Sequence, residues 1–143
     1  WLGGTRIVSR HANGLQVATD MPTELGGSGD QVSPGWLFRA GFASCTATCI
    51  AMNAASAGIE LDALEVQADS RSDARAILGL SESNGSPVYA GPHDLQLRVR
   101  IAAKGVPAER LRQLVDDSYR QSPMACVVRD AIPVALHIDA DAG

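Results

Sequence analysis

The stretch from residue 34 to residue 57, PGWLFRAGFASCTATCIAMNAASA, constrains the possible folds of this chain more than any other feature. Ser33 is suited to cap a helix that begins with Pro34, and Gly58 suits the left-handed position that follows a helix end. The stretch is rich in alanine and carries a single charge, that of Arg39. A helix that is apolar on nearly all sides is either buried in a protein or spans a membrane.

Polar side chains interrupt this helix too often for a membrane span, which needs about 18 strongly apolar residues in a row. The interrupting residues are Arg39, Ser44, Thr46, Thr48 and Asn53. Many of the other residues are small, so neighbouring backbones can approach the helix closely. We therefore expect a central helix that has packing partners on several sides, and we expect no membrane partner.

The other elements predict an α+β fold in a single domain that spans residues 1–143. Alternation of apolar and polar residues predicts strands, and apolar residues at helical spacing predict further helices. The strands are expected at 5–9, 15–20, 61–69, 95–101 and 132–139, and the helices at about 107–120 and 122–130. Part of the stretch 74–90 fits either a strand or a short helix. The order β-β-α-β-β-α-α-β lacks the regular alternation of a parallel α/β protein, so we expect antiparallel strands around the buried helix.

The composition and the chain start exclude several classes of protein. The net charge is −4 and no run of basic residues occurs, so we expect no nucleic-acid partner. The opening WLGGTR lacks the charged start and apolar core of a signal peptide. Three cysteines are too few, and odd in number, for the disulfide framework of a secreted protein. We therefore expect a cytoplasmic protein.

Common metal and cofactor motifs are also missing from the sequence. The three histidines are isolated, and neither Cys-x-x-Cys nor His-x-x-x-His occurs, so no zinc site is predicted. The glycine-rich segment 24–35, ELGGSGDQVSPG, lacks the GxxxxGK[ST] pattern of a phosphate-binding loop, and we interpret it as a plain loop. The GxSxG motif of serine hydrolases does not occur. We expect neither a metal nor a cofactor.

The cysteines carry the main chemical question. Cys45 and Cys49 are four residues apart and share one face of the predicted central helix, and Cys126 lies in a later helix. One interpretation is that they are small core residues, because free cysteine is among the most buried residue types. The other is a reactive thiol, which has to be partly ionised. At an ordinary pKa near 8.5, only about 3% of a thiol is thiolate at pH 7.

A reactive Cys45 requires a source of positive charge. It lies near the middle of its own helix, where the helix dipole contributes little, and burial raises the pKa of a thiol. An arginine that the fold brings close would favour the thiolate, and the candidates are Arg6, Arg10, Arg39 and Arg129.

Two segments together resemble the OsmC/Ohr family, the osmotically induced and organic-hydroperoxide-resistance proteins. The segment MPTELGGSGDQVSPGWLFRAGFASC resembles the family's Pro-x-Glu-Leu-Gly-Gly loop, helix start and helical cysteine, and QSPMACVVRDAIPVALHI resembles its second-cysteine segment. With the order of elements between them, the resemblance covers nearly the whole chain. It implies an OsmC-like fold, an intertwined homodimer in which antiparallel sheets wrap around long central helices and the active sites lie at the dimer interface.

The resemblance also implies thiol peroxidase chemistry. Cys45 falls on the peroxidatic position, and Arg6 falls near the arginine that stabilises the thiolate. Two positions depart from the family pattern, because Ser122 stands where the second cysteine is expected and Gly35 where a glutamate pairs with the arginine. Cys126, one helical turn beyond Ser122, is the candidate resolving thiol. An external thiol reductant that acts directly on Cys45 is the alternative.

Two functions follow as hypotheses. The first is thiol-dependent reduction of organic hydroperoxides, with Phe42, Trp36 and Met124 as apolar neighbours that favour alkyl hydroperoxides over hydrogen peroxide. The second is a non-catalytic protein of the same fold that binds a small apolar ligand and whose thiols are structural. The missing second cysteine and glutamate favour the second hypothesis, and the thiol arrangement of the family favours the first.

Overall fold

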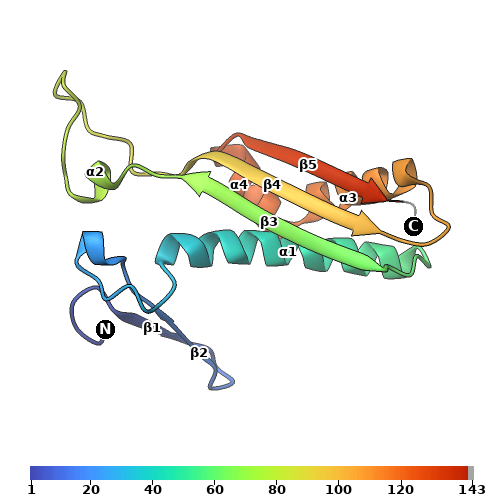
Figure 1. The fold of residues 1–143 in the computed structure, drawn as a ribbon, viewed down its shortest axis with the longest axis horizontal. Coiled ribbons are helices and arrows are strands. Elements are labelled where there is room, and N and C mark those ends of the chain that lie inside the picture. Colours follow the sequence, from blue (N-terminus) through green and yellow to red (C-terminus); the bar gives the residue numbers. More distant parts are fainter. Residues whose placement is uncertain (142–143) are drawn as a thin grey trace. The chain divides into compact units, whose positions relative to one another are not determined.

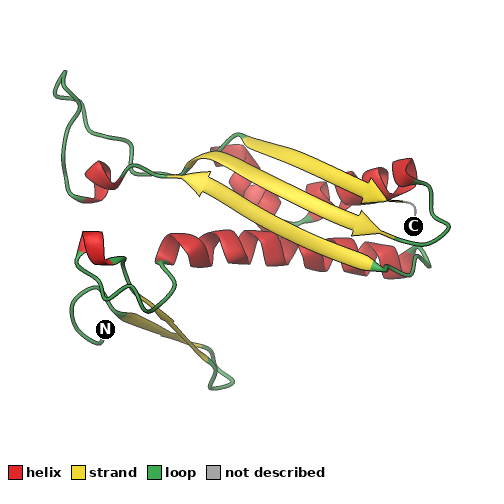
Figure 2. Cartoon of the chain, viewed as in Figure 1, coloured by secondary structure: helices red, strands yellow, loops and turns green. Residues whose placement is uncertain are grey.

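The computed structural model of the protein describes residues 1–141. Helices and strands follow the order expected from the sequence, and the ambiguous stretch contains a short helix, α2 (Figures 1 and 2). The elements are β1 (Ile7–Arg10), β2 (Gln16–Thr19), the 3-10 helix η1 (Thr23–Leu25), α1 (Pro34–Ser56), β3 (Ala63–Arg71), α2 (Ala74–Ile77), β4 (His93–Ala102), α3 (Ala108–Gln121), α4 (Pro123–Ala131) and β5 (Val134–Asp141). The predicted α+β class is confirmed. No helix within residues 1–141 is long and apolar enough to cross a bilayer.

The chain divides into two compact units, Trp1–Gly41 and a second unit that begins at Phe42. In the first unit, β1 and β2 form an antiparallel hairpin, and the chain then passes through η1 and a glycine-rich loop to the start of α1. The turn between the two strands contains Gly14, which has a φ of +91°. The single domain over 1–143 stays a prediction, and residues 142–143 lie outside the described residues.

Helix α1 begins and ends at the predicted signals. The Ser33 hydroxyl accepts a hydrogen bond from the Trp36 amide at 3.2 Å, which caps the first turn. At the other end Gly58 adopts a left-handed φ of +66°, and the amides of Gly58 and Ile59 donate to the carbonyl oxygens of Ala55 and Ala54. These two bonds form a Schellman motif, so the helix terminates where its local sequence directs.

The second unit is built on a three-stranded sheet in the order β3-β4-β5. β3 pairs with β4 antiparallel, as expected, but β4 and β5 are parallel, so the expectation of purely antiparallel sheets was wrong for this pair. The reason is the connection between β4 and β5, which consists of α3 and α4. A helical crossover returns the chain to the end at which β4 began, and this arrangement produces parallel pairing.

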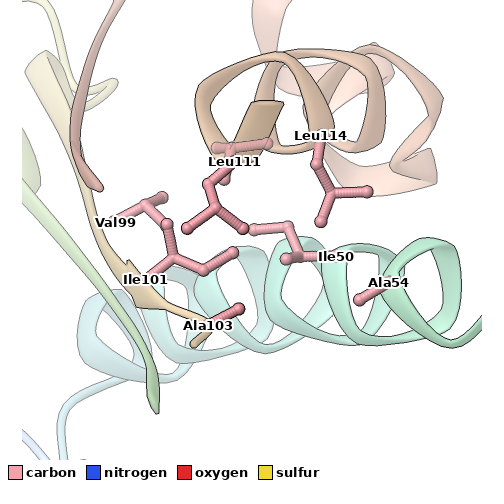
Figure 3. Packing of buried hydrophobic residues seen from close by; sticks show 8 residues of the cluster. Ile50, Ala54, Val99, Ile101, Ala103, Leu111 and Leu114 are labelled. Atoms are coloured by element: carbon pink, nitrogen blue, oxygen red, sulfur yellow. The ribbon is translucent and has the colours of Figure 1, made fainter. Parts of the chain in front are cut away.

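A hydrophobic core fills the space between this sheet and helices α1 and α3 (Figure 3). Alternate residues of β4 are buried, as the alternation in its sequence predicted, and they point toward the helices. The cluster consists of Ile50 and Ala54 from α1, Val99 and Ile101 from β4, Ala103, and Leu111, Leu114 and Val115 from α3. This core holds the middle of α1 against the sheet and against α3.

Only one stripe of α1 is buried within the described chain. The buried residues recur every four positions and are Phe42, Thr46, Ile50 and Ala54. Elsewhere on the helix the side chains are half-buried or exposed, and Met52 keeps 64% of its surface. The expected packing on several sides is therefore not provided by this chain alone, because its own sheet and helices cover a single face.

Candidate thiol site

The first turn of α4 meets the Cys45 side of α1. Ser122 caps α4 and is fully buried, and its hydroxyl donates a hydrogen bond to the Cys45 sulfur at 3.3 Å. Seventy-seven positions separate these two residues in the sequence. Serine followed by proline is typical of a helix start, but nothing in the local pattern indicated that the capping hydroxyl would face a cysteine.

The amides at the start of α4 have distinct partners. Pro123 has no amide hydrogen, so the first donors available in this helix are Met124 and Ala125. The Met124 amide lies near enough to the Cys45 sulfur to lower the pKa of that thiol. The Ala125 amide donates to the Ser122 hydroxyl oxygen at 3.5 Å. The Cys45 sulfur therefore receives the Ser122 hydroxyl hydrogen next to the positive end of a helix dipole.

These contacts separate the acidities of the two α1 thiols. The Ser122 hydroxyl and then the Met124 amide lower the pKa of Cys45 below its usual range, against a smaller opposing effect of burial. Burial and the neighbouring Cys45 raise the pKa of Cys49. When the pKa values of two adjacent groups move in opposite directions, the group with the lower pKa ionises first. Here that group is Cys45. From the sequence we expected this stabilisation from an arginine, and the contribution of Ser122 at the start of α4 was not predicted.

Cys126 lies one helical turn after Ser122, as the sequence indicated. Its amide donates to the Ser122 carbonyl oxygen at 2.9 Å, and its thiol donates to the Arg120 carbonyl oxygen at 3.2 Å. Cys126 is close enough to Cys49 for its charge to contribute to the raised pKa of that thiol. All three cysteines are half-buried and free in this structure.

A hydrogen-bonded side chain of α1 continues the same face beyond the thiols. The Asn53 amide nitrogen donates to the Ser118 hydroxyl at 3.0 Å and to the Gln121 side-chain oxygen at 3.1 Å. Asn53 lies two helical turns after Cys45, so these bonds attach α1 to the end of α3 just before Ser122. They help to set the position of the α4 cap against the Cys45 sulfur.

Arg6, the predicted partner of the thiolate, belongs to the first unit, whereas Cys45 belongs to the second. Within the first unit its guanidinium forms ion pairs with Asp20 and Asp30 and donates to the Ser28 hydroxyl. Asp20 is almost fully buried, and hydrogen bonds from Ser28 and from another hydroxyl, that of Thr5, hold its pKa far below its usual range. This network ties the hairpin to the glycine-rich loop.

The other predicted site residues lie in different environments. Trp36 is on the first turns of α1 and keeps 48% of its surface, and Met124 is half-buried in the first turn of α4. Phe42 is fully buried in the stripe of α1 that faces the core, and its carbonyl oxygen accepts the Thr46 hydroxyl. Gly35 lies in the first turn of α1, where an added Cβ would stand 3.6 Å from the Arg39 guanidinium. Within residues 1–141 no group of three His, Cys, Asp or Glu side chains is placed to hold a metal ion.

Fold and site together define a class of small α+β protein. In this class a thiol on a long central helix faces the start of a shorter helix. Comparisons with known proteins agree. The model of the OsmC-like protein family matches residues 27–137. The organic hydroperoxide resistance protein of Xanthomonas axonopodis pv. citri is 31% identical over 123 residues, which are 85% of this chain and 78% of that protein. The chain belongs to the OsmC-like family.

Solved structures have the same fold. An organic hydroperoxide resistance protein from Elizabethkingia anophelis superposes with a TM-score of 0.70 at 24% identity, over 97% of this chain and 91% of that one. An OsmC-like protein of unknown function from Vibrio cholerae superposes with a TM-score of 0.74 at 15% identity, over 94% and 84% of the two chains. At these identities the likeness establishes the fold, so the expected OsmC-like fold of the chain is confirmed, whereas the intertwined homodimer stays a prediction.

Proposed function

We propose that this protein is a cysteine-based reductase of organic hydroperoxides and that Cys45 is its nucleophile. The observation that carries the proposal is the 3.3 Å hydrogen bond from the buried Ser122 hydroxyl to the Cys45 sulfur. A thiol reacts with a peroxide as its thiolate, and this bond favours the thiolate. The relatives that are named organic hydroperoxide resistance proteins add support for this class of substrate.

In the proposed reaction, the Cys45 thiolate attacks the terminal oxygen of ROOH. A sulfur–oxygen bond forms and the oxygen–oxygen bond breaks, so the sulfur is oxidised to a sulfenic acid and the hydroperoxide is reduced. The leaving alkoxide takes up one proton to become the alcohol ROH. A thiol then condenses with the sulfenic acid, which yields a disulfide and one molecule of water.

We propose two sources for that second thiol. Cys126 is the internal candidate, because it lies on α4 one turn beyond the residue that contacts the Cys45 sulfur. The external candidate is a small or protein-bound thiol reductant, which would also reduce any internal disulfide. Both routes consume two thiol equivalents for each hydroperoxide, so the identity of the disulfide distinguishes them, whereas the stoichiometry does not.

We assign Arg6 a supporting role at the thiolate, as the resemblance implies. In the family pattern a glutamate orients this arginine, and Gly35 stands at that position. The carboxylates of Asp20 and Asp30 bind the Arg6 guanidinium in this chain, so they take over the orienting role. The Trp36, Phe42 and Met124 side chains supply apolar surface for an alkyl group in this proposal.

The proposed working unit is a homodimer in the cytoplasm. Helix α1 is apolar nearly all round, yet its own chain buries one stripe of it. Large apolar side chains remain exposed on both helices of the thiol site, with Met52 of α1 at 64% and Val127 of α4 at 70%. A second copy would cover such surfaces, because contiguous exposed apolar patches mark interfaces. Three free thiols are compatible with a reducing compartment.

The proposal is tested by steady-state reduction of an alkyl hydroperoxide with an excess of an external dithiol. Cys45→Ser is expected to abolish turnover, and Cys49→Ser is the matched control on the same helix face. Cys126→Ser retains turnover if an external thiol resolves Cys45, and loses it if Cys126 is the resolving thiol. If Cys45→Ser reduced the hydroperoxide at the wild-type rate, the assignment of Cys45 as the nucleophile would be contradicted.

The second candidate function is binding of a small apolar ligand without catalysis. The observation in its favour is Ser122, whose hydroxyl occupies the contact that a second thiol would make and cannot form a disulfide. In this case an apolar ligand would bind equally well to wild type and to Cys45→Ser, and neither protein would consume hydroperoxide. The turnover assay therefore decides between the two functions.

A further inference from the structure

We propose that Ser122 is a catalytic residue that holds the Cys45 sulfur as the reactive anion. This inference rests on the proposed function for its meaning in catalysis. It differs from the family pattern, in which this position holds a second thiol. Here the position holds a hydrogen-bond donor that cannot be oxidised to a disulfide.

The direction of the Ser122 hydroxyl hydrogen follows from its surroundings. The oxygen accepts the Ala125 amide, which is the ordinary contact of a capping serine. The single hydroxyl hydrogen is then available for the Cys45 sulfur, 3.3 Å away. Because Ser122 is fully buried, water does not compete for its hydroxyl. A hydrogen bond to an ion is stronger than one between neutral groups, so the bond favours the thiolate over the thiol.

Among the described residues, Cys49 on the same helix is the titratable group that affects the pKa of Cys45. Its pKa is raised, so it stays protonated while Cys45 ionises. The two thiols are not suited to form a disulfide while α1 is intact. Residues four apart in a helix have Cβ atoms about 5–6 Å apart, and a disulfide requires about 3.5–4.5 Å.

Two consequences follow for the reaction. The Cys45 sulfenic acid forms next to a group that cannot condense with it, so it persists until a thiol reaches it from another direction. The same Ser122 hydroxyl that stabilised the thiolate remains beside the oxidised sulfur. A thiol introduced at position 122 would meet the Cys45 sulfur directly, because the present oxygen already lies within contact distance of it.

The test uses the full chain with Cys49→Ser and Cys126→Ser, so that Cys45 is the single thiol. Its alkylation by iodoacetamide is measured against pH, with Ser122 and with Ser122→Ala. Loss of one hydrogen bond to the thiolate is expected to slow alkylation about tenfold at pH 6 and to move the pH midpoint upward. Identical profiles for the two proteins would overturn the inference.

A second variant separates the thiolate contact from helix capping. Ser122→Gly also lacks the hydroxyl, but glycine is tolerated at a helix cap nearly as well as serine. It is expected to shift the alkylation profile as Ser122→Ala does, with far-UV circular dichroism unchanged. If Ser122→Ala does not fold, the glycine variant alone decides the question.

A third variant tests the geometry. In the same background, Ser122→Cys is expected to form a disulfide between Cys45 and the introduced thiol with one equivalent of diamide, a thiol oxidant that requires no peroxidase activity. The disulfide is detected as the loss of two hydrogens by mass spectrometry. Absence of this disulfide at a large excess of oxidant would show that the two side chains are not adjacent, which overturns the inference.

The outcomes keep the inference and the proposed function distinct. Suppose that replacing Ser122 shifts the alkylation profile but neither wild type nor any variant reduces hydroperoxide. Then the contact between Ser122 and the Cys45 thiolate is established, and the proposed function fails. If wild type reduces hydroperoxide and replacing Ser122 leaves the alkylation profile unchanged, the proposed function stands and the inference fails.

Discussion

Ile50 is the residue whose truncation tests how firmly the core holds the thiol-bearing helix. It lies one turn beyond Thr46 in the buried stripe of α1, has no exposed surface, and packs among the core residues of β4 and α3 (Figure 3). Ile50→Ala removes three carbon atoms, which corresponds to about 2.4 kcal/mol of transfer free energy at about 0.8 kcal/mol per carbon. The cavity that remains adds to this loss, so we expect destabilisation of about 3–4 kcal/mol.

The assay is urea unfolding followed by far-UV circular dichroism, with Ile50→Val as a graded control. The valine variant removes one carbon and is expected to cost about 0.5–1.5 kcal/mol. The slope of the unfolding free energy against urea should not change, because both variants expose the same surface on unfolding. Several protein concentrations are needed, since the proposed homodimer would stabilise the folded chain in proportion to its population. A loss below about 1 kcal/mol for Ile50→Ala would refute the packing described above.

Three further predictions concern the loop and the thiols. Gly27→Ala should disorder its loop, detected as faster proteolysis there, because an added Cβ would stand 1.7 Å from the Met21 carbonyl oxygen. Limited labelling of wild type should modify Cys45 before Cys49, since their pKa values move in opposite directions. Labelling of Cys45 should also become slower as the pH drops through its pKa. Earlier labelling of Cys49 would contradict the predicted order. The lowered pKa of Asp20 stabilises the folded state above the unfolded carboxyl pKa, and this contribution is lost as pH falls toward the folded value. Asp20→Asn should therefore lower the thermal midpoint at pH 7 and flatten the loss of stability below about pH 4, and an unchanged midpoint would contradict it.

Helix and strand positions followed largely from local sequence. The boundaries of α1 were predicted because Ser33 and Gly58 act on the backbone within a few residues of their own positions. The alternation in β4 predicted which of its side chains face the core. The cap at Ser122 was likewise evident from the proline that follows it. These features depend on short-range sterics and hydrogen bonds, which a single sequence displays directly.

The pairing of distant elements required the tertiary structure. Nothing local to β5 indicates that it lies parallel to β4, because that direction depends on how α3 and α4 return the chain along the sheet. The residues of the candidate site were named in part, since Cys45 and Cys126 were singled out by their chemistry. The role assigned to Ser122 was missed, because serine at a helix cap is explained by the cap alone.

By itself, the sequence determined which segments are helices and strands, which faces are apolar, and that a helical cysteine is a candidate nucleophile. The tertiary structure decided what surrounds that cysteine. The Ser122 hydroxyl reaches the Cys45 sulfur across 77 positions of sequence because the core packs α1 against the sheet and α3, and α3 leads directly into the cap of α4. An acidity that depends on a contact between two elements is a property of their packing, and no single segment of sequence carries it.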